Sequence, residues 1–92
     1  MIIRILGEGQ YRLAGSHLDY LNEVDNEIVK AVEMEDEDSF RELLTRMLDY
    51  VRQKSEPLPL EELAESDLIL PNDDITVAEA RAIFSGEGAV PG

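Results

Sequence analysis

The first 13 residues carry the sequence pattern of a β-hairpin. Two segments rich in aliphatic and β-branched side chains flank Gly7-Glu8-Gly9. Glycine adopts the positive φ angles that a short loop between antiparallel strands needs. We therefore predict strands over residues 2–6 and 10–13, joined by a three-residue loop at 7–9.

The position of this loop fixes which residues of the two strands lie opposite each other. The expected cross-strand pairs are Leu6–Gln10, Ile5–Tyr11, Arg4–Arg12 and Ile3–Leu13. Four side chains then share the face that covers the helices: Ile3, Ile5, Tyr11 and Leu13. Arg4 and Arg12 lie side by side on the other face, where like charges oppose pairing. We interpret them as neutralised by carboxylates of the C-terminal segment, and an external anion site is the alternative.

Two amphipathic helices are predicted over residues 16–55. The first spans about His17 to Met34 with Ser16 as its N-cap. Its apolar face comprises Leu18, Leu21, Val24, Ile28 and Val32. The second begins in the acidic run 35–39, with Asp36 or Asp38 as its N-cap. Its apolar stripe comprises Phe40, Leu43, Leu44, Met47, Leu48 and Val51.

The short connection between these helices predicts an antiparallel helical hairpin whose two apolar stripes face each other. Opposite charges three or four residues apart predict exposed ion pairs on the second helix: Asp38–Arg41, Glu42–Arg46 and Asp49–Arg52. Each pair stabilises a helix by only a few tenths of a kcal/mol, roughly, so these pairs solvate the outer face rather than define a site.

The segment after residue 55 contains shorter elements. The prolines in Glu56-Pro57-Leu58-Pro59 end the second helix, and a helical turn is expected at about residues 60–65. Residues 66–71 are expected to form an extended segment or a third edge strand that stops at Pro71. Thr76 and Glu79 match a capping box for a last helix over about residues 77–84, closed by Gly86. We therefore expect one α+β domain over residues 1–92, mainly α.

The charge of the chain excludes some classes of partner. There are 21 acidic and 8 basic residues, for a net charge of −13, and such a surface repels nucleic acids and anionic lipids. Residues 56–92 contain nine acidic residues and one basic residue, Arg81. This segment is the expected docking face for a basic partner. The partner-binding residues that we predict are Glu61, Glu62, Glu65, Asp67, Asp73, Asp74 and Glu79.

The sequence offers little for catalysis, metal binding or cofactor binding. His17 is the only histidine and there is no cysteine, so a transition-metal site lacks its usual donors, and we expect His17 to be an ordinary surface residue. The acidic run 33–38 lacks the glycine and the glutamate spacing of an EF-hand loop. Gly7-Glu8-Gly9 lacks the third glycine and the following helix of a dinucleotide-binding loop. We expect no enzyme and no cofactor.

The absence of cysteine fits a reducing compartment, and the sequence shows no signal peptide and no apolar run long enough to span a bilayer. We therefore expect a cytoplasmic protein.

Three segments of the chain resemble the PspA-associated (PspAA) family. They are the opening run 1–11, Ser66-Asp67-Leu68-Ile69-Leu70-Pro71 and the final run 86–92, so the resemblance spans the whole chain. Gly7, Gly9, Gln10 and Tyr11 correspond to the opening motif of the family. The resemblance implies a compact, mainly helical domain that is encoded beside a homologue of phage shock protein A, with no enzymatic activity attached to it.

Phage shock protein A is a coiled-coil protein related to ESCRT-III that remodels stressed inner membranes. The resemblance therefore implies a non-enzymatic adaptor that binds or modulates a PspA-like protein during envelope stress. We expect it to engage a basic stretch of that partner through residues 56–79, and to approach the inner membrane only indirectly. A homo-oligomeric helical module, which buries surplus apolar surface of the second helix, is the first alternative. A small metal-binding protein or hydrolase is the second.

Overall fold

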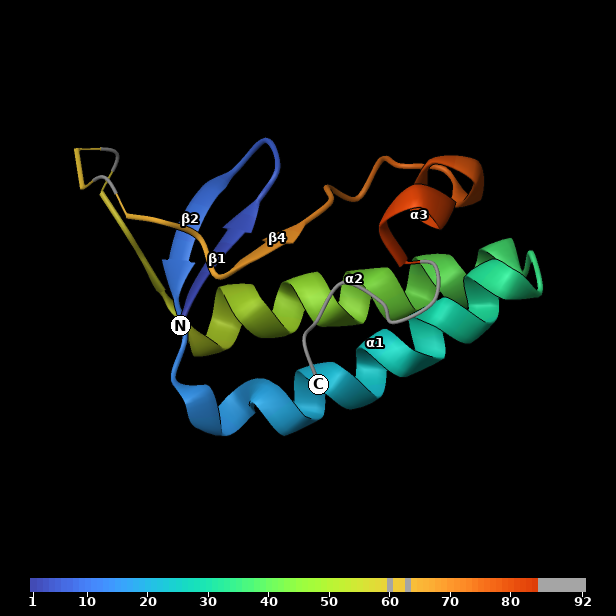
Figure 1. The fold of residues 1–92 in the computed structure, drawn as a ribbon, viewed down its shortest axis with the longest axis horizontal. Helices are drawn as coiled ribbons and strands as arrows, with labels where there is room; N and C mark the ends of the chain where they lie inside the picture. The colour runs from blue at the N-terminus through green and yellow to red at the C-terminus, as the bar shows by residue number, and fades with distance from the viewer. Residues whose placement is uncertain (60, 63, 85–92) are drawn as a thin grey trace.

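The computed structural model describes residues 1–59, 61–62 and 64–84. Its elements are β1 (Ile2–Ile5), β2 (Gly9–Arg12), a short 3₁₀ turn (Gly15–His17), α1 (Leu18–Glu33), α2 (Glu37–Lys54), β3 (Glu56–Pro57), β4 (Leu68–Leu70) and α3 (Val77–Phe84). The four strands form one sheet in the order β3-β2-β1-β4, in which β4 runs parallel to β1 and the other pairs are antiparallel. In Figure 1 the sheet lies over one end of the α1–α2 hairpin and α3 lies over the other end. The predicted α+β domain is thus confirmed.

The hairpin forms, but its predicted register is wrong. Arg4 lies opposite Gln10 and Arg12 lies opposite Ile2, so the loop occupies residues 6–8 rather than 7–9. The loop is closed by a local turn, in which the Glu8 amide donates to the Ile5 carbonyl oxygen at 3.0 Å, while the Leu6 amide donates to the Leu70 carbonyl oxygen of β4 at 3.0 Å. Gly7 and Gly9 have φ angles of 86° and 132°, which only glycine adopts without strain.

The predicted faces of the hairpin are nevertheless correct. Moving the loop by one residue shifts the pairing by two, which preserves the alternation of sides. Ile3, Ile5 and Leu13 are buried and Tyr11 is half-buried, whereas Arg4 and Arg12 are exposed on the other face. The two arginines occupy diagonal positions instead of lying side by side.

The helical hairpin was predicted correctly, except for the start of its first helix. Ser16 lies inside the 3₁₀ turn, and the N-cap of α1 is His17, which makes no side-chain capping bond. Asp36 is the N-cap of α2, and its carboxylate accepts a hydrogen bond from the Ser39 amide at 3.2 Å. Between the helices, Glu35 adopts a φ angle of 56°, in the left-handed conformation that usually closes a helix.

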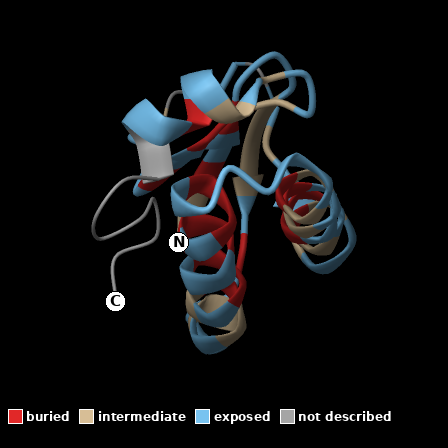
Figure 2. Cartoon of the chain, turned by 90° about the vertical axis from the view of Figure 1, so that its right-hand side faces the viewer, coloured by how far each residue is buried: buried red, intermediate tan, exposed pale blue. Residues whose placement is uncertain are grey.

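The core lies between the helical pair, the sheet and α3. The side chains of the second predicted stripe are buried except Leu43, which is half-buried, and those of α1 face them (Figure 2). The fully buried large side chains include Phe40, Leu21, Ile28, Leu44, Met47, Leu48 and Leu70. α2 therefore buries its apolar stripe within the chain, apart from the partly exposed Leu43.

The predictions for the C-terminal segment are confirmed in part. β4 and the capping box of α3 are confirmed, since Thr76 and Glu79 exchange hydrogen bonds at 3.1 Å. β3 was not predicted. The expected helical turn at 60–65 and the expected stop at Gly86 include residues outside the described part of the chain.

Of the ion pairs predicted along α2, Glu42–Arg46 and Asp49–Arg52 form, at 3.3 and 3.0 Å. Within the described ranges, however, Arg41 donates to the Asp73 carbonyl oxygen rather than to Asp38. Among the described residues, no helix is long and apolar enough to cross a membrane.

Candidate interaction surfaces

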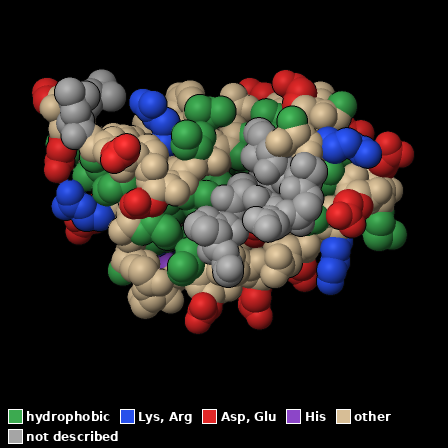
Figure 3. Space-filling model, viewed as in Figure 1, with side chains coloured by type: hydrophobic (Ala, Val, Ile, Leu, Met, Phe, Trp, Pro, Cys, Tyr) green, Lys and Arg blue, Asp and Glu red, His purple; other side chains and the backbone are tan. Residues whose placement is uncertain are grey.

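The acidic residues that were predicted to bind a partner fall into two groups. Glu61, Glu62, Glu65 and Asp67 lie in or near the connection between β3 and β4, whereas Asp73, Asp74 and Glu79 lie after β4 and in α3. Figure 1 places these connections toward opposite ends of the sheet side of the molecule. Figure 3 likewise shows acidic side chains spread around the periphery of the visible face. The described acidic residues of segment 56–79 therefore lie at two separate places on the molecule.

In the first group, two carboxylates have partners within the chain. Glu62 pairs with Arg12 at 3.3 Å, and both side chains are about half exposed. The Asp67 carboxylate accepts a hydrogen bond from the Ile2 amide at 2.8 Å, while the Asp67 amide donates to the Ile2 carbonyl oxygen. This reciprocal pair ties the start of β4 to β1.

Glu79 in the second group also has an internal role, because its carboxylate caps α3. Asp73 pairs with Arg52 at 3.2 Å. The other three side chains, those of Glu61, Glu65 and Asp74, are exposed and make no bond to any other described residue. These three carboxylates are the ones that stay available to a basic partner.

Arg52 is the centre of a charge cluster that the sequence did not predict. Its guanidinium binds both carboxylate oxygens of Glu8, with an Nε–Oε1 distance of 3.0 Å, and also contacts Asp49 at 3.0 Å and Asp73 at 3.2 Å. The side chains of Arg52 and Glu8 are about 30% exposed. The cluster connects the hairpin loop, α2 and the segment after β4, and it borders a shallow hollow of about 260 Å³.

Hydrogen bonds and burial shift the pKa values of three groups in or beside this cluster, Glu8, Arg52 and Tyr11. The hydrogen bonds from Arg52 lower the pKa of Glu8, although burial opposes the shift, and Tyr11 lowers it further. The same contacts raise the pKa of Arg52. Burial, followed by the hydrogen bond to Glu8, raises the pKa of Tyr11. All three groups therefore keep their ordinary charge at neutral pH, and the cluster is a static connection rather than an acid–base pair.

The residues of the opening motif have structural roles. The Tyr11 hydroxyl donates to Glu8 at 3.1 Å, which places Tyr11 at the edge of the Arg52 cluster. The Gln10 amide donates to the Ala64 carbonyl oxygen at 2.7 Å and to the Ser66 hydroxyl at 2.9 Å, which holds the segment before β4 against β2. Gly7 and Gly9 supply the loop conformation.

The two arginines considered as an anion site have different surroundings. Arg12 is paired with Glu62, a carboxylate of the C-terminal segment. The Arg4 guanidinium makes no hydrogen bond or ion pair within residues 1–59, 61–62 and 64–84. They do not act as one clamp in this structure.

His17 is half-buried rather than a plain surface residue. Its ring shares a hydrogen bond with the Tyr50 hydroxyl and packs edge-on against the Tyr50 ring, with centroids 5.4 Å apart. In the part of the chain that the structure describes, no group of three or more His, Cys, Asp or Glu side chains could hold a metal ion.

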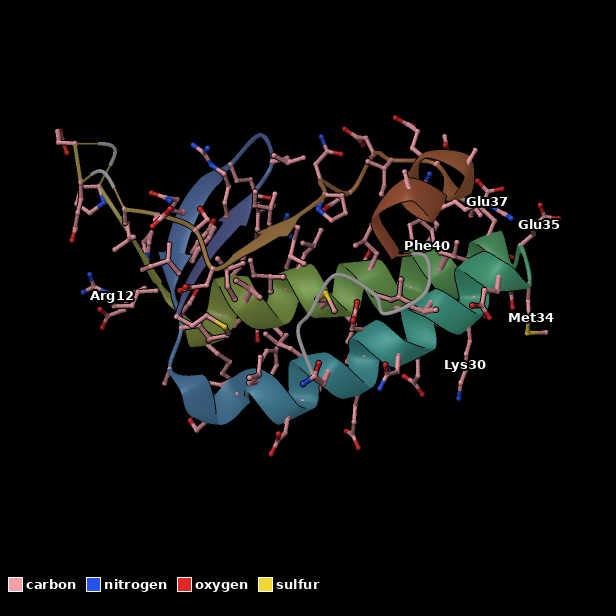
Figure 4. All side chains as sticks on the ribbon, viewed as in Figure 1. Arg12, Lys30, Met34, Glu35, Glu37 and Phe40 are labelled. Carbon is pink, nitrogen blue, oxygen red and sulfur yellow. The ribbon has the colours of Figure 1, made fainter. Side chains whose placement is uncertain are left out.

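Two further surfaces were not predicted from the sequence. A groove of about 360 Å³ lies between α1 and α2 near their connecting turn, with Met34 and Leu43 among its lining residues. Figure 4 shows Met34 and Lys30 extending outward at this end of the hairpin, far from Arg12 at the other end. Leu6 and Ile69, on the outer face of the sheet, are 45% and 53% exposed. The alternation of side chains along β1 predicts that Leu6 points outward. The position of Ile69 on the same face follows only from the β1–β4 pairing, which places Ile69 opposite Arg4.

The chain matches one family of known proteins. A family model described as "PspA-Associated protein" matches residues 1–92, the whole chain. No curated protein and no solved structure matches the chain.

Proposed function

Because the chain belongs to the PspA-associated protein family, which suggests an accessory role linked to PspA, we propose that it is a non-enzymatic adaptor that binds a PspA-like protein. Its action would be to bind this partner or to modulate its assembly during envelope stress. The family match is the observation that carries the proposal.

The partner that we propose is a coiled-coil protein with a basic stretch, and charge supports this choice. The chain has a net charge of −13, so a basic surface is attracted at long range and associates quickly at low ionic strength. Glu61, Glu65 and Asp74 offer carboxylates that are not already engaged by other described residues. We narrow the contact residues to these three, since Glu62, Asp67, Asp73 and Glu79 already have partners within the chain.

The proposed location is cytoplasmic, with access to the inner membrane only through the partner. The excess of acidic residues repels anionic lipid headgroups, so direct binding to such a surface is unfavourable.

The test measures binding to the full-length PspA homologue of the same organism by isothermal titration calorimetry at increasing salt. The variant Glu61→Gln/Glu65→Gln/Asp74→Asn removes three negative charges from the proposed contacts. The control Asp19→Asn/Glu33→Gln/Asp38→Asn removes three exposed charges from the helical hairpin. Circular dichroism checks the folding of each variant.

We expect the first variant to bind several-fold more weakly than the control and with a smaller salt dependence, because its contacts with the basic stretch are lost. Binding that is equally tight in both variants and insensitive to salt would contradict the charge-led contact. No binding by the unmodified chain at any salt concentration would contradict the adaptor function itself.

A further inference from the structure

Among the described residues of this acidic chain, one arginine, Arg4, has no acceptor for its guanidinium. Acidic residues outnumber basic ones by 21 to 8, and within the described ranges every other arginine contacts an oxygen of the chain. The guanidinium of Arg4 contacts none there, and its side chain is exposed on the face of the sheet that the helices do not cover. Its positive charge is therefore available to an external carboxylate.

Two exposed aliphatic side chains lie beside this arginine. Ile69 is directly opposite Arg4 in the β1–β4 pair and is 53% exposed, and Leu6 is two residues farther along the same face of β1 and is 45% exposed. Figure 3 shows hydrophobic side chains next to a basic one along the upper margin of the molecule, over the hairpin. Arg4, Leu6 and Ile69 are called the sheet-face patch below.

The strands beneath the patch belong to a mixed sheet. β4 is parallel to β1 and the other two pairs are antiparallel, and a sheet that contains antiparallel pairs can leave one face exposed. Here the helices cover the face that carries Ile3, Ile5, Leu68 and Leu70, all at most 4% exposed. The helices leave the opposite face, which carries the patch, exposed, so a helix of a partner can lie on it as a further layer.

We propose that the sheet-face patch docks an amphipathic helix of the PspA-like partner. This helix places a carboxylate on Arg4 and aliphatic side chains on Leu6 and Ile69. The inference rests on the proposed function and adds a contact separate from the acidic one. An arginine that makes a charge-assisted hydrogen bond next to apolar contacts is typical of the residues that dominate binding energy at protein interfaces.

Charge distinguishes this occupant from two others. A second copy of the chain would have to approach against the repulsion between two molecules that each carry a net charge of −13. An anionic membrane would find one cation on a strongly negative molecule. A helix with a single carboxylate beside an apolar stripe satisfies Arg4 without bringing in a second highly charged surface.

The experiment compares two patch variants with matched controls in binding to the full-length PspA homologue. Arg4→Glu reverses the charge in the patch, and Lys54→Glu reverses an exposed charge at the end of α2. Leu6→Ser/Ile69→Ser removes the aliphatic contacts, and Met34→Ser removes the 78% exposed side chain at the α1–α2 turn. A photo-crosslinking residue at position 69 then identifies the segment that covers the patch.

We expect both patch variants to weaken binding about tenfold or more, the controls to stay within about twofold, and the cross-linked peptide to contain an acidic residue within an apolar helical pattern. Normal binding by both patch variants would overturn this inference and leave the adaptor function intact. Cross-links to a second copy, or Arg4-dependent binding to vesicles of anionic lipid, would also overturn it. Failure of the wild-type chain to bind would overturn the adaptor function and this inference together.

Discussion

Replacing Arg52 with glutamine removes the cation that joins three parts of the fold. The pairs with Asp49 and Asp73 involve carboxylates that are about half exposed, and such pairs contribute about 0.2–1 kcal/mol each. The two-point contact with Glu8 is less exposed, and we assign it about 1 kcal/mol. The substitution should therefore lower the free energy of unfolding by about 2 kcal/mol, which corresponds to about 8–16 °C in the melting temperature of a domain of this size.

Urea denaturation followed by circular dichroism measures this loss, with Arg46→Gln as the matched control. Arg46 makes one exposed pair, with Glu42 on the same helix, so its removal should cost no more than about 0.5 kcal/mol. Equal losses in the two variants would refute the assignment of a connecting role to Arg52.

The pH dependence provides an independent check on the same cluster. Hydrogen bonds from Arg52 lower the pKa of Glu8 below its ordinary value of 4.5 in the folded chain. The resulting stabilisation is present above the pKa of Glu8 in the unfolded chain, and it is lost as the pH falls through the lower, folded value. The wild-type protein should therefore lose more stability between neutral and acidic pH than Arg52→Gln does. Parallel pH profiles would show that Glu8 gains nothing from Arg52.

Three smaller predictions concern backbone conformation and capping. Gly9→Ala should destabilise the chain by about 1–2 kcal/mol because the φ angle of Gly9 is 132°, whereas Gly15→Ala should change stability little; equal melting temperatures would contradict this. Glu35→Gly should stabilise by no more than about 0.5 kcal/mol, since it relieves the φ angle of 56° at the end of α1 but also removes the exposed ion pair with Arg81, and a lower urea midpoint would count against it. Thr76→Ala should cost about 1 kcal/mol because it breaks the capping box with Glu79, and unchanged amide exchange in α3 would argue otherwise.

The helical hairpin could be predicted because its signal is local. The apolar side chains of α2 recur at the helical period, and they are buried as expected, with Phe40 and Met47 fully inaccessible. Asp36 could be predicted as an N-cap because only a few residue types, aspartate among them, commonly accept hydrogen bonds from the backbone amides of the first turn of a helix. Ser16 has the same chemistry, but it lies inside a 3₁₀ turn, which was not predicted.

The register of the hairpin is set by a turn that starts one residue earlier than the two glycines indicated. The Glu8 amide donates to the Ile5 carbonyl oxygen, which leaves Leu6 in the loop, and the Leu6 amide bonds to Leu70 of β4. β3 was missed for a different reason, since it consists of Glu56 and Pro57 alone, and proline is normally read as the end of a strand.

The charge cluster could be predicted only in its local part. Asp49 lies three residues before Arg52, so the helical spacing indicated that pair. Glu8 and Asp73 are 44 and 21 residues away in the sequence, and only the folded arrangement brings them to the same guanidinium. The sheet-face patch likewise depends on the parallel pairing that places Ile69 opposite Arg4.

The most direct test of the adaptor function is sedimentation velocity of the unmodified chain mixed with its full-length PspA homologue, first at low and then at high ionic strength. We expect the 10.3 kDa chain to migrate with the larger protein at low salt and to be partly released at high salt, because long-range attraction is screened. A chain that sediments as an independent slow boundary under both conditions would contradict the account.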